Sequence, residues 1–385
     1  MQFSAGTCLP EISPQALALH ARSIVVDTHC DTTQRLLDDR FSFGAKNPNG
    51  HLDIPRLRQG GVDAVFLAIW TPGTVTGRVA VERALNQIDA IRRHAALHSA
   101  ELTLAQTSAD IREAHTTGKI ALLMALEGGH MINNDLDVLR NYAKLGVRYM
   151  TLTHMLNTGW ADSSTDKPEH NGLTDFGKQV IREMNRLGMM VDVSHASDKT
   201  FYDVLDVSEA PPIATHSSCR ALCDSPRNLT DEMMRALASR DGIVQINFHV
   251  GFLSQEFRNA EAAQPRLREK VDAMILEKCA GESPEKLVVA AEVVRELVAE
   301  GVLPRVEWTK IIDHIDHAVS VAGIDHVGFG SDFDGADMPC GMDDASFLPH
   351  ITDALLKKSY SESDVEKILG GNTLRLMEDV DAAAK

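Results

Sequence analysis

The sequence predicts an α/β fold, a (β/α)8 barrel of the TIM type, and three observations carry this prediction. Eight short runs rich in Val, Ile and Leu stand apart along the chain, and near-continuous apolar runs are typical of parallel strands buried on both faces. Amphipathic stretches of helical periodicity fill most of the intervals, which indicates parallel strands joined by helices. His, Asp or Glu closely follow six of the eight runs, at the strand ends where barrel enzymes hold their active sites.

The expected elements follow from this pattern in chain order. The eight strands are placed at residues 24–27, 64–69, 120–126, 149–153, 189–193, 212–215, 243–248 and 326–329. Helices are expected at 79–99, 136–145, 175–187, 230–238, 308–321 and 361–379, the last interrupted at Gly370 and Gly371. The charged interval 251–305, between strands seven and eight, is expected to be a helical insertion that forms a lid or an interface, with helices at 266–279 and 284–300. No linker is evident, so residues 1–385 are predicted to be a single barrel domain.

The composition limits the classes of function. Of 385 residues, 38 are Lys or Arg and 55 are Asp or Glu, so the formal net charge is −17. This charge repels phosphate backbones and anionic lipids, and we therefore expect neither nucleic-acid binding nor membrane binding. Residues 1–21 lack the basic start and apolar run of a signal peptide, which predicts a cytoplasmic protein. Six scattered cysteines without a Cys-x-x-Cys pair demand no disulfide framework.

Imidazole and carboxylate groups follow the expected strands in a pattern that predicts a metal centre, because C-terminal strand ends converge on the mouth of a barrel. The candidate ligands are His29 and Asp31 after the first strand, Glu127 after the third, His195 after the fifth and His216 after the sixth. On extended backbone, the spacing of two would place His29 and Asp31 on one face. These ligand types suit Zn²⁺, with Mn, Co or Fe as alternatives. Five ligands exceed the need of one tetrahedral ion, which favours two Zn²⁺ ions about 3.5–4 Å apart that share a hydroxide.

Four further residues are candidates for catalysis and substrate binding. Asp332, at the eighth strand, is expected to shuttle a proton, and the alternative is a structural aspartate in the turn before Gly335. His154, at the end of the fourth strand, either completes the metal set or hydrogen-bonds a developing oxyanion. Arg227 suits bidentate capture of a carboxylate, and read alone it is equally a surface arginine. His249, at the end of the seventh strand, is expected to line the pocket.

Several other polar residues near these strands are interpreted as structural. Alternation along the first strand points Cys30 away from the proposed ligands, so we expect it to pack in the core. Asp334 is interpreted as a turn residue, and His130 as either a loop residue or a contact to a metal ligand. His314 and His317 lie on a charged helix, which favours a solvated or structural role for both.

With these residues in place, the chain resembles the membrane dipeptidase family, also called peptidase family M19, from about residue 24 to residue 377. The resemblance rests on an ordered set of short motifs. They are Asp-Thr-His-Cys-Asp at 27–31, Glu-Gly-Gly-His at 127–130, Arg-Tyr-Met-Thr-Leu-Thr-His at 148–154, Asn-Thr-Gly-Trp-Ala-Asp at 157–162, Asn-Arg-Leu-Gly-Met-Met-Val-Asp-Val-Ser-His at 185–195, Thr-His-Ser-Ser at 215–218, Ser-Pro-Arg-Asn at 225–228 and Gly-Ser-Asp-Phe-Asp-Gly at 330–335.

The resemblance implies a binuclear zinc barrel and a role for each candidate residue. One Zn²⁺ ion would be held by His29 and Asp31 and the other by His195 and His216, with Glu127 bridging the two. His154 would contact the scissile carbonyl or its oxyanion. Arg227 would bind the substrate's terminal carboxylate, and Asp332 would shuttle the proton.

These inferences together predict a binuclear zinc dipeptidase in which a metal-bridging hydroxide attacks the peptide bond. The expected substrates are dipeptides with a free C-terminal carboxylate, and the resemblance adds those with a C-terminal D-residue. A homodimer is the expected assembly. One alternative is another amidohydrolase-type barrel, such as a phosphotriesterase or a cyclic amidase; many of those use a carboxylated Lys at the fourth strand, and residues 149–154 contain no Lys. The other is a non-catalytic metal-binding barrel, which the complete ligand set and Asp332 disfavour.

Overall fold

The computed structural model of the chain describes residues 10–38, 40–264, 266–278 and 286–384. Within these residues, eight parallel strands form a nearly closed barrel in the order β1-β2-β4-β5-β6-β7-β8-β9, which confirms the predicted fold class. Strand β3 (Leu102–Leu104), too short to be expected from its sequence, pairs with β4 outside this path. The barrel strands are β1 (Val26–Cys30), β2 (Ala64–Trp70), β4 (Ile120–Glu127), β5 (Val147–Thr151), β6 (Met190–Asp192), β7 (Ile213–Ala214), β8 (Ile243–Ile246) and β9 (Val327–Phe329).

Alternation along the strands fills the inside of the barrel and positions one candidate ligand. In β4, Ala121, Leu123 and Ala125 join a buried cluster with residues from six other barrel strands, whereas the residues between them pack in a second cluster that includes the surrounding helices. Side chains two apart in a strand share a face. The last residue of β4, Glu127, therefore continues the inward series at the mouth of the barrel, where it is buried.

The first strand departs from its sequence prediction. The apolar pattern places its end at Asp27, but β1 continues to Cys30, which still pairs with Leu67 of β2, and its polar residues are buried as completely as its apolar ones. The register of β1 against β2 shifts between Asp27 and Cys30. Such an irregularity re-aims side chains, and the His29 ring reaches Tyr149, a member of the inner cluster. The spacing of His29 and Asp31 was interpreted on extended backbone, but Asp31 begins the 3₁₀ helix η1 (Asp31–Leu37).

The barrel closes just beyond the named strands, in the segment that carries three candidate residues. Cys30 and Phe333 form a parallel bridge. The backbone N–H of Asp31 donates to the carbonyl of Phe333 at 2.8 Å, and the N–H of Asp332 donates to the carbonyl of His29 at 3.0 Å. The hydrogen bonds that close the sheet therefore also hold the first and last strand ends against each other.

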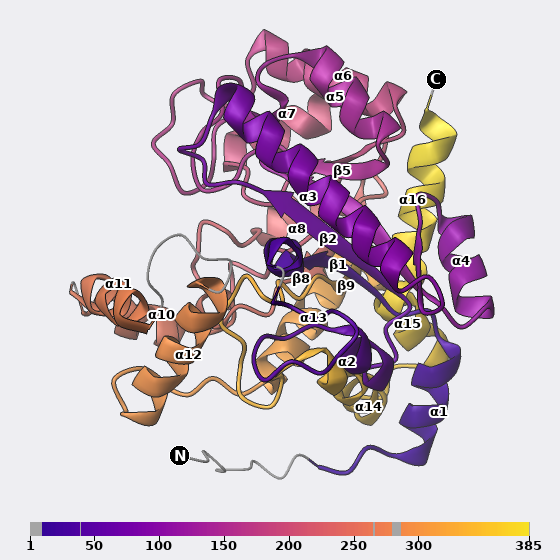
Figure 1. Cartoon of the computed structure of the whole chain (residues 1–385), viewed down its shortest axis with the longest axis vertical. Helices are drawn as coiled ribbons and strands as arrows, with labels where there is room; N and C mark the ends of the chain where they lie inside the picture. Colours follow the sequence, from indigo (N-terminus) through magenta and orange to yellow (C-terminus); the bar gives the residue numbers. More distant parts are fainter. Residues whose placement is uncertain (1–9, 39, 265, 279–285, 385) are drawn as a thin grey trace.

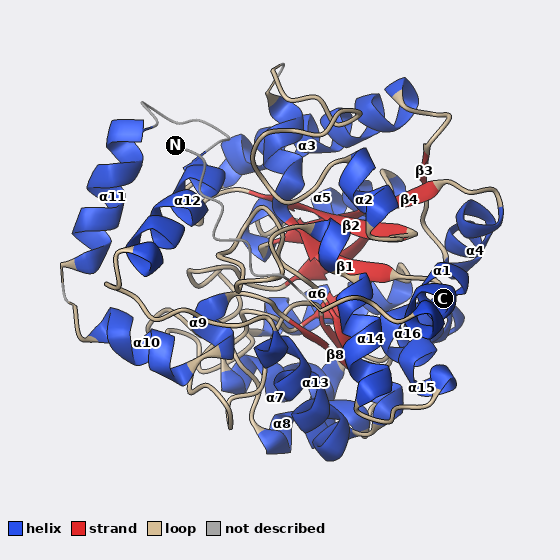
Figure 2. Cartoon of the chain, turned by 90° about the horizontal axis from the view of Figure 1, so that it is seen from below, coloured by secondary structure: helices blue, strands red, loops and turns tan. Residues whose placement is uncertain are grey.

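Helices surround the strands in both views of the molecule (Figures 1 and 2). Five expected helices are found within two residues of their expected ends, as α3, α5, α6, α8 and α13. The expected helix 361–379 is divided into α15 and α16, because the Gly370 backbone leaves the helical conformation and a Cβ there would lie 2.4 Å from the carbonyl oxygen of Ile24. Among the residues that the structure describes, no helix is both long and apolar enough to cross a bilayer. Outside the interval between β8 and β9, the α-helices of the described residues are α1 (Pro14–Arg22), α2 (Ile54–Gln59), α3 (Gly77–Leu97), α4 (Ser108–Thr116), α5 (Leu136–Lys144), α6 (Asp175–Arg186), α7 (Asp198–Val207), α8 (Asp231–Ala238), α13 (Thr309–Ala322), α14 (Pro349–Lys357), α15 (Glu362–Glu366) and α16 (Asn372–Ala383).

The interval between β8 and β9 is helical, as its composition suggested. Its described residues form α9 (Val250–Leu253), α10 (Gln255–Ala262), α11 (Leu267–Lys278) and α12 (Lys286–Ala299). In Figure 2, α10, α11 and α12 lie together at one side of the molecule. They share an apolar cluster of their own, which includes Phe257, Val293 and Leu297. The end of the first expected helix, at residue 279, and the start of the second, at 284–285, lie outside the described residues.

Candidate metal centre

Side chains from six strand ends meet at the C-terminal mouth of the barrel. All five candidate metal ligands are among them, together with His154 and Asp332. All of these except Asp332 have an imidazole or carboxylate of the same set within 4.0 Å, and a ligand atom of Asp332 lies within 4.8 Å of those of His29 and Asp31. They come from the ends of β1, β4, β5, β6, β7 and β9, as His29 and Asp31, Glu127, His154, His195, His216 and Asp332.

Glu127 lies at the centre of this group, and its two oxygens face different histidines. Its Oε1 is 3.1 Å from Nε2 of His195 and 3.4 Å from Nε2 of His216. Its Oε2 is 3.6 Å from Nε2 of His29, which is in turn 3.7 Å from Oδ2 of Asp31. All five side chains are buried. A carboxylate in this position has one oxygen available to each of two neighbouring cations.

Three overlapping groups in the described residues bring ligand atoms within 4.8 Å of one another, and Glu127 or His29 belongs to each. This overlap is what a site with shared ligands requires. The groups are His29 with Glu127 and His216, Glu127 with His154 and His195, and His29 with Asp31 and Asp332.

The chemistry of these donors fits a cation. Nε2 of His29 is buried and has no hydrogen-bond partner, and an unpaired buried nitrogen is costly unless something else binds it. Nε2 of His195 and Nε2 of His216 are only 2.9 Å apart beside one carboxylate oxygen. Burial, followed by the nearby carboxylates Glu127 and Asp332, raises the pKa of Asp31 well above its usual range. Positive charge among these acids would let all of them ionise.

His216 is held in the form that binds metal. Its Nδ1 lies 2.8 Å from Oγ1 of Thr215, which donates to Oδ2 of the buried Asp192 at 2.7 Å. Because the Thr215 hydrogen is used on Asp192, the Nδ1–H of His216 must be the donor to Thr215, and its Nε2 carries a lone pair. Burial also lowers the pKa of His216 to about 4, so that the imidazole is neutral at pH 7. Asp192 was not singled out from the sequence, although it stands three residues before His195 in a motif.

Asp332 is held by residues that the sequence analysis did not single out. The amide Nδ2 of Asn247, just after β8, donates to Oδ2 of Asp332 at 2.8 Å. The backbone of Asp332 has φ +65°, a strained conformation for a residue other than glycine. Gly335 packs so closely that a Cβ there would lie 1.8 Å from Oδ2 of Asp31 and 2.8 Å from Oδ1 of Asp332. Asn247 lies within the strand expected at 243–248, and its polar side chain in that mostly apolar run was the sequence signal for it.

His154 lies on the more open side of the group. Its Nε2 is 3.7 Å from Oε1 of Glu127, its side chain is 17% exposed, and its ring meets that of His195 edge to face at 4.8 Å. Trp70, the last residue of β2, packs edge-on against it at 5.6 Å. Burial lowers the pKa of His154, so the neutral ring can donate one hydrogen bond.

Arg227 is buried beside the group and is not a surface residue. Its side chain donates one hydrogen bond, to the carbonyl of His216 at 3.3 Å, while Nε and Nη1 are buried without a partner. Burial lowers its pKa to about 10, so it is still a cation at neutral pH. Its guanidinium lies over the ring of Phe252, and His249 packs edge-on against the same ring at 4.6 Å. The unpaired N–H groups of Arg227 can donate hydrogen bonds to an acceptor such as a carboxylate.

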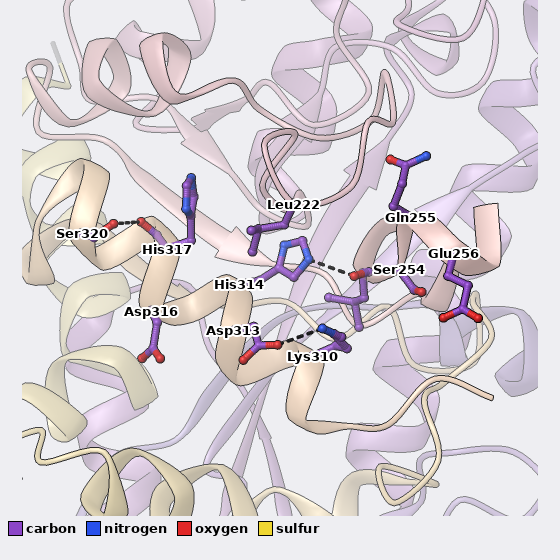
Figure 3. A pocket seen from close by; sticks show the side chains of 11 residues that line it. Leu222, Ser254, Gln255, Glu256, Lys310, Asp313, His314, Asp316, His317 and Ser320 are labelled. Atoms are coloured by element: carbon purple, nitrogen blue, oxygen red, sulfur yellow. Dashed lines mark hydrogen bonds and ion pairs between the residues drawn. The ribbon is translucent and has the colours of Figure 1, made fainter. Parts of the chain in front are cut away.

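Three of the polar residues interpreted as structural have structural contacts. Asp334 accepts hydrogen bonds from the hydroxyl of Thr32 and the backbone of His51, and Cys30 is buried in the core. His314 lies at a hollow on the outside of the barrel between α13 and the α9–α10 segment (Figure 3). It is buried there, with Nδ1 accepting from the N–H of Cys219 and Nε2 donating to the carbonyl of Leu253.

A parallel α/β barrel with a buried cluster of imidazoles and carboxylates at its mouth has the architecture of metal-dependent hydrolases. Comparison with known families defines the class further. The sequence profile described as membrane dipeptidase (peptidase family M19) matches residues 13–385. The chain belongs to this family.

Individual relatives agree with this assignment. Dipeptidase 3 of Mus musculus is 35% identical over 97% of this chain and 67% of its own length. Among solved structures, the probable dipeptidase PvdM of Pseudomonas aeruginosa superposes with a TM-score of 0.83 at 27% identity, over 96% of this chain and 98% of its own. A metallopeptidase of Rhodobacter sphaeroides, solved with a phosphinate mimic of L-Ala-D-Ala, gives a TM-score of 0.76 at 27% identity, over 93% and 99%. The chain is thus a dipeptide-hydrolysing enzyme of the M19 metallopeptidase family.

Proposed function

We propose that this chain is a binuclear zinc dipeptidase that cleaves dipeptides with a free C-terminal carboxylate, including those with a C-terminal D-residue. One observation carries the proposal: the two oxygens of the buried Glu127 face separate histidines, His29 on one side and the His195–His216 pair on the other. This arrangement offers a bridging carboxylate between two ion positions.

The ligands divide into two sets. His29 and Asp31 would hold one Zn²⁺ ion, His195 and His216 the other, and Glu127 would bridge them. Nitrogen and carboxylate donors are those that Zn²⁺ prefers in catalytic sites. When bound, the ions supply Lewis acidity at the scissile carbonyl and ease the deprotonation of water.

The substrate is bound through its charged end. The buried guanidinium of Arg227, which keeps unpaired N–H groups on Nε and Nη1, binds the C-terminal carboxylate in bidentate fashion through one adjacent pair of its N–H groups. His154 then hydrogen-bonds the scissile carbonyl oxygen and its oxyanion, since its neutral imidazole lies at the open side of the group. His249, whose ring packs against Phe252 below Arg227, lines the pocket next to this carboxylate.

Asp332 moves the proton. Its carboxylate takes a proton from the attacking water and delivers it to the leaving amine, so that the peptide bond breaks with no net change in its own protonation. The hydrogen bond from Asn247 holds the carboxylate in place for both transfers. The proposal of C-terminal D-residues is supported by the R. sphaeroides neighbour, which binds a mimic of L-Ala-D-Ala.

Metal removal and the Asp332→Asn variant together test this function. Dialysis against a chelator should abolish hydrolysis of dipeptides such as L-Ala-D-Ala, and Zn²⁺ should restore it. Asp332→Asn should lower kcat by at least about 100-fold while metal analysis still finds close to two zinc ions per chain. Full activity after complete metal removal would refute the metal-dependent mechanism, and an Asp332→Asn variant with unchanged kcat would refute the proton shuttle.

A further inference from the structure

Tyr149 is a buried polar residue at the metal centre that the proposed function leaves without a role. It belongs to the motif at residues 148–154 and lies in β5, fully buried among the inward-facing residues of the barrel. Its ring packs against Phe66 at 5.4 Å. Burial raises the pKa of its phenol well above the usual range, so that the hydroxyl keeps its hydrogen at physiological pH. A neutral phenol inside a barrel requires hydrogen-bond partners.

Two hydrogen-bond partners of the phenol belong to the first strand. Its Oη lies 2.8 Å from Nδ1 of His29 and 3.0 Å from the carbonyl oxygen of Thr28. The carbonyl of Thr28 is an acceptor only, and the phenol has a single hydrogen to donate. If this hydrogen is directed to Thr28, the phenolic oxygen is free to accept a hydrogen bond from the Nδ1–H of His29.

The opposite arrangement is unfavourable. Donation from Tyr149 to Nδ1 of His29 would leave the phenolic oxygen and the Thr28 carbonyl oxygen facing each other at 3.0 Å with no hydrogen between them. The hydrogen bond to Thr28 therefore directs the single hydrogen of the phenol away from His29.

We propose that Tyr149 is a positioning residue that fixes His29 in the tautomer with a proton on Nδ1 and a lone pair on Nε2, directed toward Glu127 and Asp31. This inference rests on the proposed function, because it concerns one of the proposed zinc ligands. Metal-binding histidines usually donate their second ring N–H to a fixed acceptor, which sets both tautomer and orientation. Here the acceptor is a phenol that is itself oriented by a backbone carbonyl.

The arrangement around His216 follows the same logic with different groups. There, Thr215 accepts from Nδ1 and donates to the carboxylate of Asp192. In both cases the last group in the chain of hydrogen bonds can only accept, which determines the direction of every bond before it. In contrast, Nδ1 of His195 is buried without a partner. Among these three ligands, His29 and His216 are therefore the ones oriented before the metal binds.

The Tyr149→Phe variant tests the role of the hydroxyl alone. It keeps the aromatic ring and its packing, and it removes the acceptor for the His29 N–H. Loss of such an outer partner typically weakens metal binding about 10–100-fold. We expect the dissociation constant of the Zn²⁺ ion held by His29, measured by competition with a chromogenic chelator, to rise by about this factor.

Tyr142→Phe provides a matched control. Tyr142 is also a buried phenol that donates to a backbone carbonyl, that of Met131 at 3.0 Å, and within the described part of the chain it has no hydrogen bond to a proposed metal ligand. Tyr149→Phe loses two buried hydrogen bonds and Tyr142→Phe loses one, so the metal-free Tyr149→Phe should unfold at a somewhat lower temperature than metal-free Tyr142→Phe. Only Tyr149→Phe should bind zinc more weakly. Equal zinc affinity in Tyr149→Phe and the unsubstituted chain, or an equal loss in Tyr142→Phe, would overturn the proposal.

A direct measurement covers the case in which Tyr149→Phe does not fold. In the metal-free, unsubstituted chain labelled with ¹⁵N-histidine and observed at alkaline pH, the His29 signals, assigned with His29→Asn, should show a protonated Nδ1 and an unprotonated Nε2. The reverse tautomer would refute the role of Tyr149. If instead the unsubstituted chain binds no Zn²⁺ at all, the proposed function fails, which distinguishes that outcome from a failure of this inference alone.

Discussion

Gly335 is the position where the smallest change should have a large effect on the metal centre. A Cβ at this residue would lie 1.8 Å from Oδ2 and 2.6 Å from Cγ of Asp31, and 2.8 Å from Oδ1 of Asp332. The φ of Gly335 lies outside the left-handed region, so alanine would cause no backbone strain there. The nearest atoms that an added Cβ would meet belong to two carboxylates of the site, so the Gly335→Ala substitution tests steric contact with them.

The size of the effect follows from these distances. An ordinary contact begins at 3.4 Å, so the Asp31 oxygen must retreat by about 1.6 Å to accommodate the new methyl group. Catalytic groups have to be held within about 0.5 Å of their productive positions, and a misplacement of about 1 Å can cost about 100-fold in rate. We expect kcat/KM to fall at least 100-fold and the ion held by Asp31 to be lost. The overpacking itself should cost about 1–3 kcal/mol of unfolding free energy.

The assay combines metal analysis of the purified variant with dipeptide hydrolysis and urea unfolding. Gly118→Ala is the control, since Gly118 has φ +68° and nothing within 4 Å of its added Cβ. That substitution should cost about 1–2 kcal/mol through backbone strain, with metal content and kcat/KM unchanged. The reasoning is wrong if Gly335→Ala retains two zinc ions per chain and a kcat/KM within about threefold of the unsubstituted enzyme.

Two further predictions concern Arg227 and His314. Arg227→Ala should lower kcat/KM for free dipeptides about 100-fold, equivalent to about 3 kcal/mol, and should affect C-terminally amidated dipeptides far less; equal losses on both substrates would exclude capture of the carboxylate. Burial lowers the pKa of His314 to about 4, below its value of about 6.5 in the unfolded chain. Protonation of Nδ1 would also break the hydrogen bond that this nitrogen accepts from the N–H of Cys219. The unfolded chain then binds the proton first, so stability should decrease as the pH falls from about 6.5 to about 4. His314→Gln should reduce the slope of unfolding free energy in that window by about 1.4 kcal/mol per pH unit, and an unchanged slope would contradict the assignment.

Much of the site could be located from the sequence because the barrel has a simple rule. Parallel strands place their C-terminal ends at one mouth, so a polar residue after each apolar run can be assigned to that mouth without knowing any distance. Glu127, His195 and His216 are found where this rule puts them. Arg227 was assigned to the same mouth, but only the structure shows that it is buried and that two of its nitrogens have no partner. The proposed zinc identity and the expected homodimer stay predictions.

The sequence by itself determined the order of strands and helices, the end of each strand that carries polar groups, and the family. Tertiary structure alone decided how those groups are held. The irregular register of β1 directs His29 inward, and the seam between Cys30 and Phe333 joins the two ends of the barrel. Tyr149, Asp192 and Asn247 orient their neighbours through hydrogen bonds. Hydropathy and spacing describe residues that are close along the chain, whereas these contacts join residues from 23 to about 300 positions apart and depend on how the sheet closes.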